Sequence, residues 1–224
     1  MTRSGHVRTV LVTSFEPFDG QAVNASHAAV VALVANRSQA RGFDLVTLQL
    51  PVSFRGARRA LRVAVGTHAP EVVLCVGEAG GRAAVGLERL AVNVIDARIP
   101  DNDGSAPVDV PVIAGAPAAF FSTLPLRACV EAVAGAGVPV EISNTAGTYV
   151  CNATFYALMH LLDQHPRVVG GFVHVPRTPD QVAAGEPSLA TAQTARALEA
   201  ILAVASRARA SGPGSAEADD HPVA

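Results

Sequence analysis

The feature that most constrains the fold is a short, nearly continuous apolar run, EVVLCVG, at residues 71–77. Pro70 precedes this run, and Gly77 ends it. A strand that is apolar at successive positions must be covered on both of its faces, as the strands of parallel sheets are. The run therefore predicts an α/β protein in which helices cover both faces of a sheet.

The remainder of the chain alternates between strand-like and helix-like segments. Short β-branched runs predict strands, and apolar residues at helical spacing predict helices. The predicted strands cover residues 7–14, 45–50, 71–77, 138–143 and 168–175, and the predicted helices cover residues 24–36, 54–65, 126–134, 149–164 and 188–208. This alternation predicts a single-domain, three-layer α/β/α sandwich with a mostly parallel twisted sheet.

Several local features refine this plan. Ser188 is expected to cap the last helix, and the arginines of the helix at residues 54–65 are expected on its solvated face. Residues 100–117 are rich in Pro, Asp, Asn and Gly and predict a long ordered loop. The domain is expected to span residues 1–210. Residues 211–224 contain Gly, Pro, Ala and acidic residues without apolar periodicity, so they predict a disordered tail.

Charge and hydropathy argue against two classes of partner. The chain has 17 Lys and Arg against 19 Asp and Glu, a formal net charge of −2. Without a basic surplus, the protein is not expected to bind nucleic acid. The apolar run at residues 9–13 is too short for a signal peptide or a membrane span. We therefore expect a cytoplasmic protein without a membrane partner.

The chain has three cysteines, Cys75, Cys129 and Cys151, without metal-ligand spacing. An odd number argues against a disulfide scaffold and fits a reducing compartment. Cys75 lies within a predicted strand and Cys129 within an amphipathic helical pattern, so both are expected in the core. Cys151 instead begins a predicted helix, where unpaired N–H groups and the helix dipole favour a thiolate and can bind an oxyanion. Cys151 is therefore the candidate nucleophile.

A nucleophilic cysteine needs a base and a group that orients the base. His174 ends the strand at residues 168–175, and active sites collect at the carboxyl ends of parallel strands. The residues alone leave open that His174 is an ordinary core histidine. Glu88, in LERL, is one acid among many that could orient it, and a surface ion pair is the alternative.

The glycine-rich stretch GEAGGR at residues 77–82 follows a predicted strand, as a dinucleotide-binding loop would. It lacks the third glycine at the required offset, and no acidic residue follows at the expected distance. The stretch therefore gives only weak support for a cofactor site.

Seven stretches together resemble the pyroglutamyl peptidase I family of cysteine peptidases. They are VLVTSFEPFDG, LPVSF, GEAGGR, LERLAVNVIDARIPDNDG, AFFSTLP, ISNTAGTYVCN and GFVHVPRTPDQ. They occur in the family's order and at its approximate spacing over about residues 7–205. The resemblance implies hydrolysis of the amide after an N-terminal pyroglutamate (5-oxoproline) by a triad of Cys151, His174 and Glu88, without metal or cofactor.

The resemblance also implies a substrate pocket for the lactam ring. Phe15 and Phe18 would line it, the backbone of Glu78 would bind the lactam, and Arg98 would lie near the reacting carbonyl. Tyr149 and Val150 would form another wall. Peptides with an N-terminal pyroglutamate are the expected partners, and members of the family often form homo-oligomers.

Some residues depart from the family's pattern. Ser14 and Asp19 stand where glycine is usual, Ala25 where proline is usual, and Glu78 where Gln or an apolar residue is usual. We expect the Glu78 side chain to turn away from the lactam, because an inward carboxylate would have to stay protonated or pair with Arg82 or Arg98. Two alternative functions stay open: a nucleoside phosphorylase or hydrolase on a related scaffold, and an inactive binding homologue.

Overall fold

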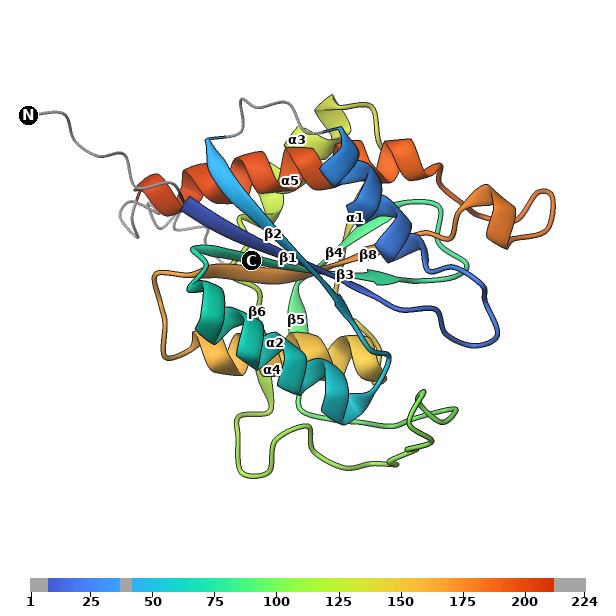
Figure 1. Cartoon of the computed structure of the whole chain (residues 1–224), viewed down its shortest axis with the longest axis vertical. Coiled ribbons are helices and arrows are strands. Elements are labelled where there is room, and N and C mark those ends of the chain that lie inside the picture. Colours follow the sequence, from blue (N-terminus) through green and yellow to red (C-terminus); the bar gives the residue numbers. More distant parts are fainter. Residues whose placement is uncertain (1–7, 37–41, 212–224) are drawn as a thin grey trace, which may run out of the picture.

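A computed structural model describes residues 8–36 and 42–211. Among these residues, a six-stranded sheet lies between two layers of helices (Figure 1). Its order is β2 (Phe43–Leu50), β1 (Arg8–Phe15), β3 (Val72–Glu78), β8 (Val169–Val175), β4 (Val85–Glu88) and β7 (Val140–Ser143). The first four are parallel, whereas β4 pairs antiparallel with β8 and parallel with β7. The predicted α/β/α fold with a mostly parallel sheet is confirmed.

Helices cover both faces of the sheet. On one face lie α1 (Ala25–Ala35), α3 (Leu126–Gly135) and α5 (Thr191–Ser211), and on the other lie α2 (Phe54–His68) and α4 (Val150–Leu162) (Figure 1). Residues of β3 alternate between the two cores: Val72, Leu74 and Val76 pack in one, and Val73 and Cys75 in the other. This alternation explains why residues 72–76 are apolar without a break.

The helices begin close to the predicted residues, with one exception. Asn24 caps α1 by accepting a hydrogen bond from Ser26 N, and Ser53 caps α2 by accepting one from Gly56 N. The prediction for α5 was wrong at its start, because α5 begins at Thr191 and Ser188 is not its cap. The amide of Leu189 donates to the carbonyl oxygen of Arg177, which holds this segment outside the helix.

Two further predictions concern α2 and α5. Arg58 was expected on the solvated face of α2, but it is half-buried and donates to the carbonyl oxygens of Phe54 and Val112. α5 extends to Ser211, and the remainder of the predicted tail, residues 212–224, lies outside the described residues. No helix in the described part of the chain is both long and apolar enough to cross a bilayer.

Three short strands were not predicted: β4, and the antiparallel pair β5 (Leu90–Val92) and β6 (Ala119–Phe121). Each has three or four residues, too few for apolar alternation to reveal. The buried Asn152 holds β5 against α4 by accepting from Val92 N and donating to the carbonyl oxygens of Val92 and Val94. Between the two strands, residues 100–117 form the predicted ordered loop, in which the Asp101 carboxylate accepts from three backbone amides.

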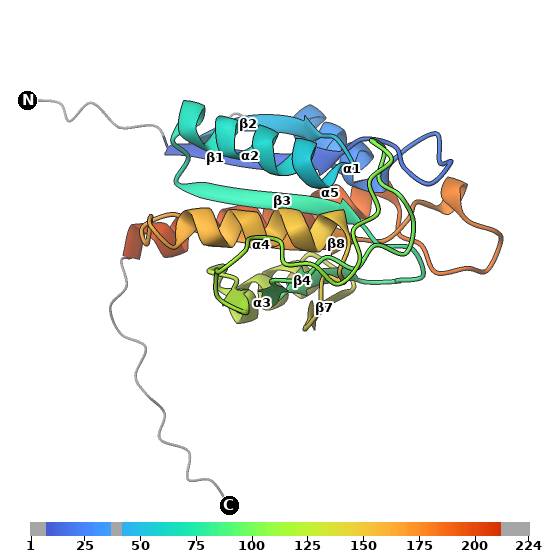
Figure 2. The same cartoon turned by 90° about the horizontal axis from the view of Figure 1, so that it is seen from below.

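The parallel strands β1, β3 and β8 end at one edge of the sheet, and the loops that follow them gather there (Figure 2). In the register of β3 and β8, Gly77 lies opposite His174. On the other side of β8, Gly86 of β4 lies opposite His174. Because β4 runs antiparallel to β8, Glu88 lies two residues beyond Gly86 on the same face of β4, and its side chain contacts His174.

Candidate active site

Cys151 lies in the first turn of α4, as predicted, one residue after the helix begins at Val150. It is partly exposed and lines a cavity of about 230 Å³ at the edge of the sheet. Its sulfur packs against β3: a Cβ atom added to Gly77 would lie 2.9 Å from Sγ of Cys151 and 2.8 Å from Cζ of Phe172. Gly77, which lies opposite His174 in the sheet, therefore leaves room for the thiol because it has no side chain.

The ionisation of Cys151 differs from the expected one. Burial raises the pKa of the Cys151 thiol to about 12, and the negative charge of Glu88 raises it further, whereas Arg82 acts in the lowering direction. Desolvation thus opposes the effect that the start of a helix has on a thiolate. A thiol with a raised pKa needs a nearby base to take its proton before the sulfur can act as a nucleophile.

His174 lies near the carboxyl end of β8 and lines the same cavity as Cys151. Its Nδ1 atom lies 2.7 Å from Oε1 of Glu88, a residue with no exposed surface. An ionised carboxylate only accepts hydrogen bonds, so Nδ1 carries the proton and Nε2 is left as the basic nitrogen. The two residues are 86 positions apart in the sequence.

Arg82 forms an ion pair with Glu88. Its Nη1 atom lies 3.3 Å from the same Oε1 atom of Glu88 that accepts from His174. The guanidinium passes over Gly86, where an added Cβ atom would lie 2.4 Å from Nη1. Arg82 therefore balances the buried carboxylate, and the sequence analysis had placed it only in a glycine-rich stretch and among possible partners of Glu78.

Aromatic side chains form one wall of the cavity. Phe15 and Val150 are buried, and the rings of Phe18 and Tyr149 lie with their centroids 5.3 Å apart. The hydroxyl of Tyr149 donates to the carbonyl oxygen of Pro100, which ties the long loop to the cavity. Arg98 lies at the rim, with 73% of its side chain exposed and Nη2 4.0 Å from a carboxylate oxygen of Asp19. All six predicted pocket residues line this one cavity.

The side chain of Glu78 is engaged in bonds outside the predicted set. Its Oε1 atom accepts from Nε of Arg177 at 3.0 Å. Its Oε2 atom accepts from Ala25 N at 2.7 Å and from Nε2 of Gln181 at 2.8 Å. Arg82 and Arg98, the partners that an inward-facing carboxylate would have needed, pair with Glu88 and Asp19 instead.

Arg177 and Gln181 were missed as residues of this site. Both belong to the stretch GFVHVPRTPDQ, which carries His174, so the motif itself was the available signal. Arg177 lines the cavity and passes beside Gly80, where an added Cβ atom would lie 3.2 Å from its guanidinium. The ion pair with Glu78 holds it there.

The other two cysteines are buried in the core, as predicted. Neither Cys75 nor Cys129 has any exposed surface, and burial raises the pKa of each thiol to about 12. All three cysteines are free thiols. Within residues 8–36 and 42–211, no three His, Cys, Asp or Glu side chains are grouped as metal ligands would be.

Comparison with known proteins gives a consistent result. The sequence model of the pyroglutamyl peptidase family matches residues 8–208. A pyrrolidone-carboxylate peptidase of Streptomyces coelicolor is 50% identical over 200 residues, which are 88% of this chain and 92% of that protein. The corresponding protein of Klebsiella pneumoniae is 48% identical over 200 residues, with the same coverage.

Solved structures resemble this fold closely. The crystal structure of pyroglutamyl peptidase I from Bacillus amyloliquefaciens superposes with a TM-score of 0.84 at 39% identity, over 89% of this chain and 95% of that one. The pyrrolidone carboxyl peptidase of Pyrococcus furiosus superposes with a TM-score of 0.83 at 35% identity, over 90% of this chain and 99% of that one.

Proposed function

This chain belongs to the pyroglutamyl peptidase family and is a cysteine peptidase that removes N-terminal pyroglutamate, and we propose that Cys151, His174 and Glu88 perform the hydrolysis. The observation that carries this assignment is the buried 2.7 Å contact between His174 and Glu88 beside a cavity that Cys151 also lines.

In the first half of the reaction, Nε2 of His174 takes the proton of the Cys151 thiol as sulfur attacks the pyroglutamyl carbonyl carbon. Because burial raises the pKa of this thiol, the thiol needs His174 to take its proton when the sulfur attacks. The Glu88 carboxylate stabilises the imidazolium that forms. Free N–H groups of the first turn of α4 stabilise the oxyanion.

The intermediate then collapses. The carbon–nitrogen bond breaks, His174 returns its proton to the leaving amine, and a thioester joins the pyroglutamyl group to Cys151. Water next attacks the thioester with His174 again as base, which breaks the carbon–sulfur bond. The products are free pyroglutamate and a peptide shortened by one residue, with the thiol restored.

We further propose that the cavity selects the neutral lactam. Phe15, Phe18 and Tyr149 offer apolar contact to the ring, and the carboxylate of Glu78 is already bonded to three donors. An N-terminal ammonium would lose its hydration against these walls, which costs several kcal/mol, and the carboxylates of Glu78 and Asp19 already pair with Arg177 and Arg98. Catalytic efficiency, kcat/KM, should therefore be at least about 100-fold higher on a pyroglutamyl amide than on the matching prolyl amide.

The decisive experiment is hydrolysis of a pyroglutamyl chromogenic amide by the wild type and by three cysteine variants. Cys151→Ala should have no measurable activity. Cys75→Ala and Cys129→Ala are matched controls that should remain active and lose about 1 kcal/mol of stability, since each removes one buried sulfur. Full activity of Cys151→Ala would exclude it as the nucleophile.

The alternative functions give different outcomes in the same assay. A nucleoside phosphorylase would ignore the amide and cleave a nucleoside in a phosphate-dependent way. An inactive binding homologue would bind a pyroglutamyl peptide without turnover. The intact contact between His174 and Glu88 favours the peptidase over both.

A cytoplasmic location and a homo-oligomeric state complete the proposal. Three free thiols suit a reducing compartment, and the family resemblance supports self-association. Sedimentation equilibrium of the purified protein tests the second point, and a strictly monomeric result would exclude it.

A further inference from the structure

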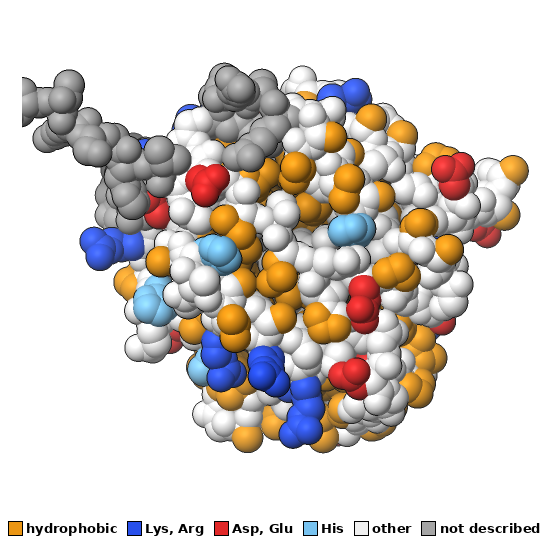
Figure 3. Space-filling model, viewed as in Figure 1, with side chains coloured by type: hydrophobic (Ala, Val, Ile, Leu, Met, Phe, Trp, Pro, Cys, Tyr) orange, Lys and Arg blue, Asp and Glu red, His pale blue; other side chains and the backbone are white. Residues whose placement is uncertain are grey.

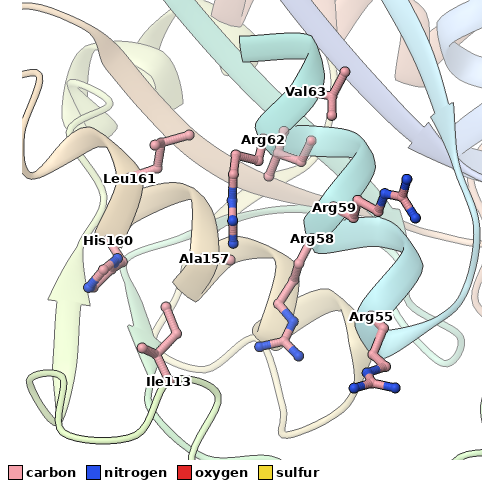
Figure 4. Close-up of a pocket in the computed structure, with 10 residues that line it drawn as sticks. Arg55, Arg58, Arg59, Arg62, Val63, Ile113, Ala157, His160 and Leu161 are labelled. Atoms are coloured by element: carbon pink, nitrogen blue, oxygen red, sulfur yellow. The ribbon is translucent and has the colours of Figure 1, made fainter. Parts of the chain in front are cut away.

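A second groove lies between α2 and α4, and its volume is about 750 Å³ (Figure 4). It shares no lining residue with the active-site cavity. Four of its lining residues are Arg55, Arg58, Arg59 and Arg62 of α2, and the others are His160 and apolar side chains. No acidic side chain lines it.

The arginines follow the helical repeat. Arg55, Arg58 and Arg62 are spaced three and four residues apart, so they share one face of α2. Figure 4 shows Arg62 and Arg58 extending from α2 toward α4, with Arg55 beside them near the start of α2 and Arg59 directed away from α4. Figure 3 shows basic side chains gathered over the lower part of this face of the molecule.

These charges lack compensation within the described part of the chain. Arg55, Arg59 and Arg62 form no hydrogen bond or ion pair with any described residue. Arg82, Arg98 and Arg177, by contrast, each lie within 4.0 Å of a carboxylate. Neighbouring like charges on a helix repel each other, so an anion in the groove would relieve this repulsion.

Arg58 is the anchored member of the cluster. It is half-buried, and its Nε and Nη1 atoms donate to the carbonyl oxygens of Phe54 and Val112. Burial lowers the pKa of Arg58, and the charges of Arg62 and Arg55 lower it further. The guanidinium is therefore held in place and already experiences the field of its two neighbours.

We propose that this groove binds a linear oligophosphate. A planar guanidinium donates two parallel hydrogen bonds to a phosphate, and Arg55 and Arg62 are exposed, so their donors lie at the groove surface. Arg55 and Arg62 are separated by about 10 Å along the helix axis, from a rise of about 1.5 Å per residue. A chain of three phosphates can contact both guanidinium groups along the groove, whereas a single phosphate would require both side chains to converge on it.

Two sources share this chemistry: inorganic polyphosphate and the triphosphate of a nucleotide. Ile113, Ala157 and Leu161 give the groove an apolar side on which a nucleoside could pack. A long nucleic acid fits poorly, because the net charge of the protein is −2 and the basic cluster covers only two turns of one helix.

The test is calorimetric titration of the full-length protein with inorganic tripolyphosphate at low salt. Micromolar binding is expected for the wild type. Arg55→Gln/Arg62→Gln should weaken it at least about tenfold, equivalent to about 1.4 kcal/mol. The matched control is Arg127→Gln/Arg196→Gln, which removes two exposed arginines from α3 and α5 on the other face of the sheet and should leave binding unchanged. Peptidase activity of each variant reports that it is folded.

Every outcome decides the proposal. Equal weakening by both double variants, or no binding by the wild type, would overturn it. Inorganic phosphate binding as tightly as tripolyphosphate, or a single-stranded oligonucleotide binding more tightly, would also overturn it. If ATP binds about tenfold more tightly than tripolyphosphate, the nucleotide is the ligand, and equal affinity points to the phosphate chain alone. Arg59→Gln should weaken binding less than Arg62→Gln.

Discussion

Replacing Glu78 by glutamine should lower the stability of the protein while leaving catalysis nearly unchanged. The two carboxylate oxygens accept three hydrogen bonds, from Arg177, Ala25 N and Gln181. A glutamine side chain offers one carbonyl oxygen, so its NH₂ group must face a donor on one side. Rotating the Gln181 amide does not solve this, because its oxygen already accepts from Thr178 N at 2.9 Å.

The magnitude follows from the bond that is lost. In the best arrangement, the glutamine oxygen takes the place of Oε2 and the charged bond to Arg177 disappears. A hydrogen bond to a charged group contributes about 1.5–3 kcal/mol, and the partial exposure of Arg177 reduces this to about 1–2 kcal/mol. At about 2–4 °C per kcal/mol for a domain of this size, Tm should fall by about 2–8 °C.

Catalysis should respond much less. The bonded carboxylate faces its own donors and not the lactam, so kcat/KM should change by less than about threefold, or about 0.7 kcal/mol. Glu141→Gln is the control, because Glu141 is exposed on β7 and should affect neither property. An unchanged Tm would show that the three bonds do not form. A gain in kcat/KM of about tenfold, with a flatter profile between about pH 5 and 8, would show that the side chain faces the substrate.

Three other perturbations test the geometry around the thiols. Gly77→Ala should reduce kcat at least about 100-fold, because the new Cβ would lie 2.9 Å from Sγ of Cys151, whereas Gly66→Ala, which meets no atom within 4 Å, should retain activity. Inactivation by iodoacetamide should accelerate steadily up to about pH 10, because the pKa of Cys151 is raised to about 12, and a plateau below about pH 8 would instead indicate a preformed thiolate. Burial raises the pKa of Cys75 from 9.0 to about 12, so its contribution to stability is present below pH 9 and is lost as the pH rises toward 12. Tm should therefore fall above about pH 9, and the fall should be smaller in Cys75→Ala.

Much of the fold could be predicted because its signals are local. Residues 72–76 are all apolar, because alternate side chains pack into the cores on the two faces of the sheet. Four helices, α1 to α4, begin within a residue of their predicted starts, because apolar periodicity and capping are also local signals. β4 escaped prediction because its four residues, VGLE, include a glycine and an acid and show no alternation.

Some residues of the candidate site could likewise be predicted from the sequence, and others could not. Position in the sequence placed Cys151 at the start of a helix and His174 near the end of a strand, whereas Glu88 needed the resemblance to a known family. The raised pKa of Cys151 could not be predicted, since it depends on how completely neighbours from distant segments exclude water. The bond between Glu78 and Arg177 joins residues 99 positions apart, and nothing in the local pattern indicates it.

The sequence alone determined which segments are strands and helices and which residue types are available for nucleophilic chemistry. Those properties depend on neighbours a few positions away, which is the range over which apolar periodicity and helix capping act. The tertiary structure decided that β4 lies antiparallel beside β8, which brings Glu88 within 2.7 Å of His174, and that Arg177, not Arg82 or Arg98, pairs with Glu78. Strand order and direction are set by the packing of the whole sheet, because burial and Coulomb energies depend on distance in space and not on separation along the chain.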